Sequence, residues 1–241
     1  PQLGPDAQAM IALLKGKVGV SYGDIQTVLK DFFEIPLSRG GGAQIVLRVA
    51  DRVKAAYGGI QVAIRRSRIV YPDETGWKVA GLLQWMWVFV ARRATLFVIR
   101  PSRGFDVPEK ILGAEWGGKM THDGWAPYNR FENALHQQCL GHIRRRCKTL
   151  LDVATRGAVR FPRAVQELLG DAFHLRGRRD AGEVSRHGVA VATGRLDARL
   201  QRLLKKRLTN AANARLARHL SRHRSEIFPF LKYPGIEATS W

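Results

Sequence analysis

Apolar residues recur at helical spacing in the first 64 residues of the 241-residue chain. The pattern predicts helices over residues 6–16 and 21–33, and a third that starts after the glycines at 40–42 and runs to about Tyr57. Ser21, three residues before Asp24, is typical of a helix start. Region 1–64 therefore suits either a helix-turn-helix, whose third helix would contact DNA, or a packing module.

From residue 65 the pattern changes to short apolar runs bounded by turn residues, which predicts strands. The expected strands are 69–71, 83–91, 94–100, 118–121 and 134–138, with short helices over 105–113 and 127–133. The first strand should end at the acidic pair Asp73 and Glu74, and a turn through Gly76 and Gly81 should follow. This alternation indicates an α/β fold.

Helical spacing returns at residues 140–153 and continues to about Glu226, apart from an expected loop over 176–188. The stretch from His142 to Arg224 holds 21 lysines and arginines against six acidic residues. A charged run is usually a solvated helix face, but such one-sided charge favours phosphates as the counter-ions.

The whole chain carries 40 basic and 20 acidic residues, a net charge of +20 and a pI near 11. This balance favours a nucleic-acid partner, with a ribosomal-type or membrane-surface protein as the alternative. Two cysteines, Cys139 and Cys147, give no disulfide framework and indicate a reducing intracellular compartment. Because no signal peptide and no apolar run of membrane-spanning length are visible, we expect a cytoplasmic protein.

Two aspartates stand at the ends of predicted strands, Asp73 after the first and Asp123 after the fourth. They would converge if the two strands are neighbours in one sheet. Carboxylate oxygens suit Mg²⁺ or Mn²⁺, and two such ions promote attack on a phosphodiester. The alternative is structural, because Asp123-Gly124 is also an ordinary turn signal.

Thiol and imidazole groups crowd into residues 136–147, namely His136, Cys139, His142 and Cys147. Thiolate and imidazole are zinc ligands, but structural zinc sites normally use two well-separated pairs. We therefore favour packing and hydrogen bonding of Cys139 and His142 at the start of the basic helix.

Five ordered motifs resemble the transposases of the insertion-sequence-66 family. They are DETGW at 73–77, QWMWVF at 84–89, SRG at 102–104, HDGW at 122–125 and HQQCLGHIRR at 136–145. The flanks at 21–38 and 230–241 are also similar to that family. The resemblance implies an amino-terminal helical region (1–64), a ribonuclease-H-like mixed-sheet core (65–150), a basic helical insertion (151–225) and a return to the core (226–241).

The resemblance further implies a DDE transposase that binds two Mg²⁺ or Mn²⁺ ions and cuts and joins DNA at transposon ends. Asp73 and Asp123 would be the first two catalytic, metal-binding carboxylates, with Cys139 and His142 as a supporting motif. The partners would be transposon-end and target DNA, with a possible homodimer in the bacterial nucleoid. The basic residues expected to contact DNA are Arg144, Arg145, Arg146, Lys148, Lys205, Lys206 and Arg207.

This sequence departs from the family pattern at the third carboxylate. In the family two asparagines precede that residue, and here Ser240-Trp241 occupy their places. Neither Glu226 nor Glu237 matches the expected position. The chain is therefore expected to be truncated at both ends, and to bind DNA but cut it poorly. A catalytically dead DNA-binding remnant and a nuclease of the same fold are the alternatives.

Overall fold

The computed structural model describes residues 3–240, and the chain divides after Val62 into two units. The first unit is helical, and its small core is formed by Ile11, Ile25, Leu29 and Ile45. Its elements are α1 (Pro5–Leu13), a π-helical turn (Leu14–Val18), α2 (Tyr22–Phe33), α3 (Arg39–Arg52) and the start of α4 (Lys54–Arg66). The spacing of apolar residues thus located α1, α2 and α3, but the expected end at about Tyr57 was wrong, because the chain breaks at Val53 and a further helix, α4, continues to Arg66.

Side-chain caps begin α2 and α3. The Ser21 hydroxyl accepts a hydrogen bond from the Asp24 amide at 3.1 Å, as its spacing predicted. Ser38 caps α3 in the same way, so the glycines at 40–42 lie inside the helix and the expectation that they precede it was wrong. Gly42 permits close packing, since a Cβ there would lie 3.2 Å from the Tyr22 ring.

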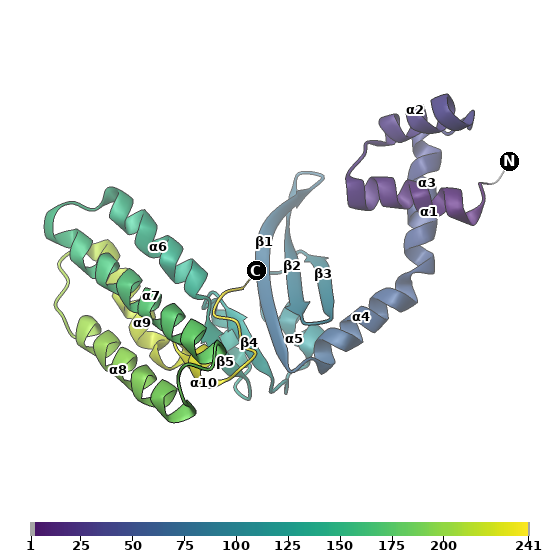
Figure 1. Cartoon of the computed structure of the whole chain (residues 1–241). Helices are drawn as coiled ribbons and strands as arrows, with labels where there is room; N and C mark the ends of the chain where they lie inside the picture. The colour runs from purple at the N-terminus through teal and green to yellow at the C-terminus, as the bar shows by residue number, and fades with distance from the viewer. Residues whose placement is uncertain (1–2, 241) are drawn as a thin grey trace. The chain divides into compact units, whose positions relative to one another are not determined.

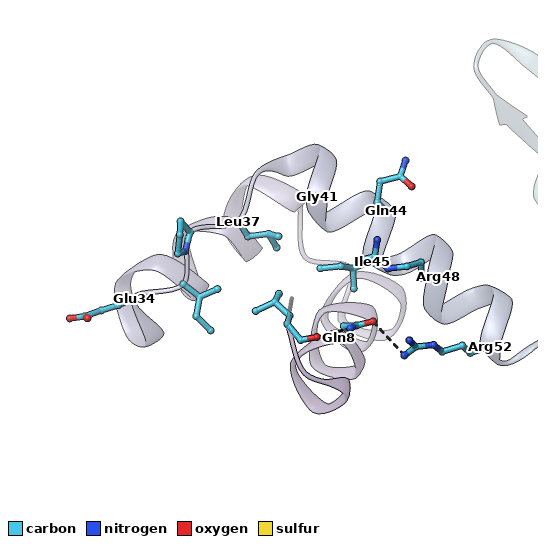
Figure 2. Close-up of a pocket in the computed structure, with 11 residues that line it drawn as sticks. Gln8, Glu34, Leu37, Gly41, Gln44, Ile45, Arg48 and Arg52 are labelled. Carbon is cyan, nitrogen blue, oxygen red and sulfur yellow. Dashed lines mark hydrogen bonds between the residues drawn. The ribbon is translucent and has the colours of Figure 1, made fainter. Parts of the chain in front are cut away.

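A pocket of about 480 Å³ opens between α1, the α2–α3 connection and α3 in the first unit (Figure 2). Arg48 and Arg52 stand on one side of it, and Glu34 on the other. Arg52 is engaged with Gln8 at 3.5 Å. The pocket mixes apolar and polar lining residues and groups no set of catalytic side chains.

The second unit, from Ala63, is built on a five-stranded mixed sheet in the order β3-β2-β1-β4-β5 (Figure 1). β1 pairs in parallel with β4, β4 in parallel with β5, and the other pairs are antiparallel. The strands are β1 (Ile69–Val79), β2 (Leu82–Ala91), β3 (Ala94–Arg100), β4 (Lys119–His122) and β5 (Leu135–Gln138), with helix α5 (Asp106–Leu112) and a 3₁₀ turn (Ala126–Arg130) between them.

β1 is much longer than its apolar run. The expectation that it ends before Asp73 was wrong, because residues 71–79 pair with residues 82–90 of β2. Gly76 is therefore a strand residue, and the turn falls at Ala80 and Gly81, whose φ angles are 49° and 82°. The polar residues continue the strand because cross-strand pairing in a hairpin does not require burial on both faces.

Within the described residues, the α-helices that follow the sheet are α6 (Leu140–Val153), α7 (Arg160–Asp180), α8 (Arg186–Leu204), α9 (Ala211–Arg222) and α10 (Pro229–Lys232). The expected loop at 176–188 was wrong, since α7 continues to Asp180. Arg179 stabilises this last turn by donating to the carbonyls of Phe230 and Leu231 at 2.7 and 2.9 Å. The helical spacing expected to continue to about Glu226 is divided further, because Asn210 caps the start of α9.

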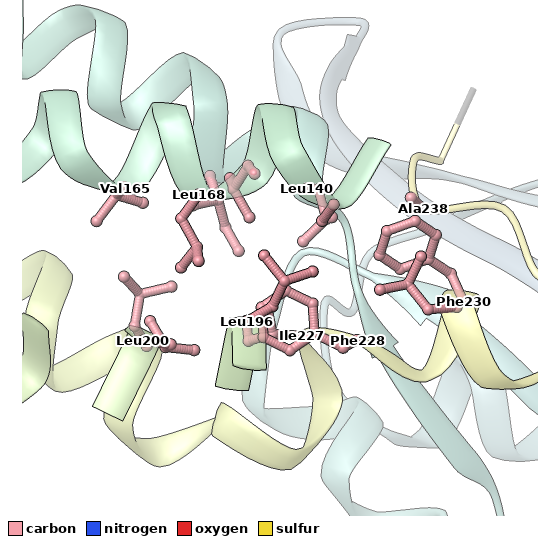
Figure 3. Packing of buried hydrophobic residues seen from close by; sticks show 14 of the residues in the cluster. Leu140, Val165, Leu168, Leu196, Leu200, Ile227, Phe228, Phe230 and Ala238 are labelled. Carbon is pink, nitrogen blue, oxygen red and sulfur yellow. The ribbon is translucent and has the colours of Figure 1, made fainter. Parts of the chain in front are cut away.

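Two cores lie on opposite faces of the parallel strands. Adjacent residues Ile69 and Val70 on β1 contribute to different cores, as alternating strand side chains must. One core holds the aromatic residues around Trp87 and Tyr128. The other joins the sheet to the helices, and Figure 3 shows Leu168 of α7 there, with residues of α6, α8 and the carboxyl-terminal segment.

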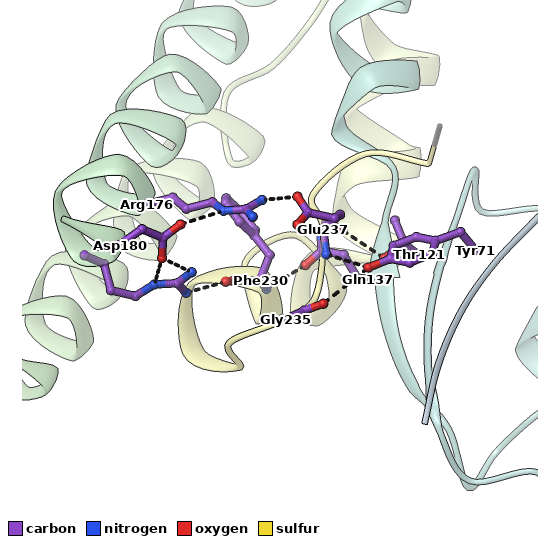
Figure 4. A network of polar contacts seen from close by, with 9 residues as sticks. Tyr71, Thr121, Gln137, Arg176, Asp180, Phe230, Gly235 and Glu237 are labelled. Carbon is purple, nitrogen blue, oxygen red and sulfur yellow. Dashed lines mark hydrogen bonds and ion pairs between the residues drawn. The ribbon is translucent and has the colours of Figure 1, made fainter. Parts of the chain in front are cut away.

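The carboxyl-terminal segment forms polar contacts with residues of β1 and β4 (Figure 4). The Tyr71 hydroxyl donates to the Gly235 carbonyl at 3.3 Å and accepts from the Glu237 amide at 3.0 Å. Thr121 donates to the Glu237 carbonyl at 2.9 Å, and Arg176 of α7 pairs with the Glu237 carboxylate at 2.7 Å. Residues 235–238 thereby join the sheet to the helices.

Candidate active site

Two carboxylates come together where β1 and β4 lie side by side. These strands are parallel neighbours, with Val70 opposite Met120. The same register continued three residues further places Asp73 beside Asp123, which directly follows β4. The neighbouring strands that convergence requires are thus present, although Asp73 lies within its strand and not at the end.

The environment of Asp73 disfavours its negative charge. Burial raises the pKa of Asp73 above its usual value, and the nearby charge of Asp123 acts in the same direction. The Glu74 amide, which donates to Asp73 Oδ1 at 2.9 Å, opposes this shift, as do His142 and Arg145. Within residues 3–240 neither aspartate forms an ion pair, and the Oδ2 atom of each has no hydrogen-bond partner.

The turn after Asp123 is held in one conformation. The Trp125 amide donates to Asp123 Oδ1 at 2.8 Å, and Gly124 has a φ of 87°. A Cβ at Gly124 would lie 2.7 Å from both Gln138 Oε1 and His219 Cε1. Only glycine therefore suits this position, for backbone conformation and for space.

Two histidines beneath the turn form a hydrogen-bonded chain. The Gly124 amide donates to His122 Nδ1 at 3.1 Å, His122 Nε2 lies 2.9 Å from His136 Nδ1, and His136 Nε2 lies 3.0 Å from the Phe131 carbonyl. Since a carbonyl only accepts, His136 Nε2 carries a proton and its Nδ1 accepts from His122. Burial lowers the pKa of His122 to about 3, so its ring is neutral near pH 7.

Glu74, next to Asp73, is fully committed to contacts within the protein. Its side chain is 1% exposed and accepts from Arg103 at 2.9 and 3.1 Å and from the Tyr128 hydroxyl at 2.6 Å. The Arg103 guanidinium lies between the rings of Trp85 and Trp125, at 4.6 and 3.9 Å from their centroids. The sequence patterns did not predict this cluster, although Arg103 in the SRG motif was an available signal.

Cys139 and His142 lie at the start of α6, where the sequence placed them. Burial alone would raise the pKa of the Cys139 thiol, but His142 and hydrogen bonds from the Ser240 amide and hydroxyl lower it to about 7. Contact with Cys139 and the charges of Asp73 and Asp123 raise the pKa of His142. The pair therefore links the carboxylates, α6 and the carboxyl-terminal segment.

The remaining candidate ligands are dispersed. Burial raises the pKa of Cys147 to about 11 in the helical core, while His136 contacts His122. Glu226 accepts from Gln138 at 2.6 Å and contacts His223 at 3.0 Å, and Glu237 pairs with Arg176. Residues 3–240 contain no group of three or more His, Cys, Asp or Glu side chains arranged to hold a metal ion.

The predicted DNA-binding residues fall in two places. Arg144, Arg145, Arg146 and Lys148 are exposed on α6, and Arg145 acts electrostatically on Asp73. Lys205, Lys206 and Arg207 are exposed where the chain leaves α8.

The family model described as the IS66 family of transposases matches residues 2–240. The chain belongs to the IS66 transposase family. All five motifs that carry the resemblance lie inside the matched range, which confirms the sequence-based assignment. No curated protein matched the chain. None of the helices within residues 3–240 is long and apolar enough to cross a membrane.

Proposed function

We propose that the chain is the catalytic core of a DDE transposase with a ribonuclease-H-like fold, acting on DNA at transposon ends. The observation that carries this proposal is that Asp73, on β1, and Asp123, directly after the parallel neighbour β4, interact electrostatically in a chain of the IS66 family. The sheet order, with a parallel β1–β4 pair beside an antiparallel hairpin, is compatible with that fold.

The donor chemistry of the two aspartates fits Mg²⁺ or Mn²⁺. Each has a carboxylate oxygen without a hydrogen-bond partner within residues 3–240, and no Lys or Arg there pairs with either group. Two neighbouring anions left unpaired in a protein of net charge +20 are best neutralised by a cation. When bound, such ions supply charge neutralisation and activation of the attacking oxygen in phosphodiester cleavage.

The side chains around the aspartates act mainly by positioning. Glu74, fixed by Arg103 and Tyr128, holds the backbone of β1 next to Asp73. The His122–His136 chain fixes the turn that carries Asp123. The positions of the two aspartates matter because small displacements of catalytic groups greatly reduce reaction rates.

The test is cleavage of end-labelled duplexes that carry the terminal sequences of the encoding element, with and without Mg²⁺ or Mn²⁺. We expect metal-dependent nicking that is lost in Asp73→Asn and Asp123→Asn. The matched control is Asp152→Asn, which removes an exposed carboxylate on α6. Full cleavage by Asp73→Asn would refute the assignment.

A second candidate is a DNA-binding protein without strand cleavage. It is favoured by one observation, that the described residues hold no group of three or more His, Cys, Asp or Glu side chains arranged to bind a metal ion. In the same assay this candidate predicts DNA binding by the unsubstituted chain, no nicking with either metal, and no effect of Asp73→Asn on affinity.

A further inference from the structure

Two cationic surfaces lie one after the other along α9. The first is a groove of about 310 Å³ between α6 and α9, which exposes Arg145, Arg146 and Arg215. The second is a pocket of about 610 Å³ at the amino-terminal end of α9, which contains Arg156, Arg160, Lys206 and Arg207. No acidic side chain lines either one.

The cations of these surfaces have no ion-pair partner within residues 3–240. Several other arginines of the helical region do have one: Arg199 of α8 pairs with Asp171 at 2.5 Å, Arg178 of α7 with Glu183 at 3.2 Å, and Arg224, which follows α9, with Asp197. Unpaired cations gathered in a groove are available for an external polyanion, whereas paired ones are already neutralised.

α9 connects these surfaces to the candidate active site. His219, near its carboxyl end, packs against the Gly124 turn beside Asp123. At the other end Asn213 donates to the Ala158 carbonyl at 2.7 Å, which fixes the floor of the pocket. From His219 to Asn210 the helix rises about 14 Å, since each residue adds about 1.5 Å.

We propose that the DNA strand leaving the active site follows the groove between α6 and α9 and is clamped through its phosphates in the pocket at the start of α9. One strand has a phosphate for every ~3.4 Å of helix axis, so a rise of about 14 Å spans about four nucleotides. The groove thus contacts phosphates next to the cleaved bond, and the pocket contacts those about four nucleotides away. The proposal rests on the proposed function, because it takes Asp73 and Asp123 as the origin of the path.

The test is ethylation interference on an element-end duplex bound by Asp73→Asn, without divalent ions, so that the result does not depend on cleavage. We expect ethylation to weaken binding at two groups of phosphates, one at the cleavage position and one about four nucleotides away. In Arg156→Gln/Arg160→Gln, and in Lys206→Gln/Arg207→Gln, the distant group should lose its interference while the near group keeps it.

Salt dependence gives an independent measure of the same contacts. Each pocket double substitution should reduce the slope of log affinity against log salt by about 2, close to 0.9 for each lost phosphate contact. The matched control is Arg92→Gln/Arg93→Gln, which removes two exposed cations from the β2–β3 turn and should leave the slope and the interference pattern unchanged.

The proposal would be overturned if the pocket variants gave the same interference pattern and the same salt slope as the protein without pocket substitutions. So would loss of interference at both groups together, which would indicate nonspecific attraction to the basic helices. Failure of the proposed function is a different result, since it removes metal-dependent nicking and leaves this binding pattern intact. Thermal denaturation of each variant checks folding.

Discussion

Arg103→Ala should destabilise the second unit more than an ordinary surface substitution, although Arg103 is 34% exposed. The change removes two hydrogen bonds to Glu74, whose side chain is 1% exposed, and leaves that carboxylate with Tyr128 as its remaining side-chain donor. Removing one partner of a buried ion pair costs about 3–5 kcal/mol. The loss of contacts with two tryptophan rings costs about 0.5–1 kcal/mol for each ring.

Because Arg103 keeps contact with solvent, we take the lower end of this range, about 3 kcal/mol. For a unit of this size, 1 kcal/mol shifts Tm by about 2–4 °C, so thermal denaturation should show a decrease of about 6–12 °C. Asp73 lies on the same strand as Glu74, and the cleavage rate should therefore fall together with stability.

Glu74→Gln provides the decisive comparison, because it removes the carboxylate charge that Arg103→Ala leaves unpaired and keeps the shape of the side chain. The double variant Arg103→Ala/Glu74→Gln should be more stable than Arg103→Ala alone by about 1–2 kcal/mol. Burial already raises the pKa of Glu74, and removing Arg103 raises it further. The cost of Arg103→Ala should accordingly shrink as the pH falls through the raised pKa. A cost below 1 kcal/mol, or a double variant no better than the single, would refute this account.

Two further substitutions test the turn after β4 and the start of α6. Gly124→Ala should cost more stability and activity than Gly182→Ala: both glycines have positive φ, at 87° and 75°, but the added Cβ meets close neighbours only at Gly124. Thermal denaturation and nicking rates measure the difference, and equal effects would show that the contact with Gln138 and His219 is unimportant. For Cys139, whose pKa is lowered from 9.0 to about 7, absorbance at 240 nm should reveal a thiolate forming near pH 7 that is missing in Cys139→Ser. The stability that this thiolate contributes is present above pH 9 and is lost as the pH falls through 7, and a transition unchanged by the substitution would contradict the assignment.

Local patterns predicted much of the fold. The limits of α6 and β3 coincide with the expected 140–153 and 94–100, because both segments have strong periodicity and clear ends. The pattern failed where long-range contacts decide the structure. β1 extends past its apolar run because β2 pairs with it, and α7 continues to Asp180 because Arg179 bonds to α10.

The candidate site was predicted only in part, because local patterns show the two aspartates but not their distant contacts. Asp73 and Asp123 could be selected because each adjoins an apolar strand, a property that is visible in the sequence. The contacts around them join distant segments: Arg103 lies 29 residues from Glu74, and Glu226 lies 88 residues from Gln138. No local pattern indicates such pairs, and only the quoted SRG motif pointed to Arg103.

Ion pairs between distant residues are also not predictable from the sequence. An arginine four residues from an acid, such as Arg176 before Asp180, is a pair that the sequence shows. The pairs of Arg199 with Asp171 and Arg224 with Asp197 span 28 and 27 residues and require the fold. The basic count of region 151–225 therefore overstates the surface available to DNA. Its paired arginines join α7, α8 and the segment after α9, and the unpaired cations next to α9 remain for phosphate.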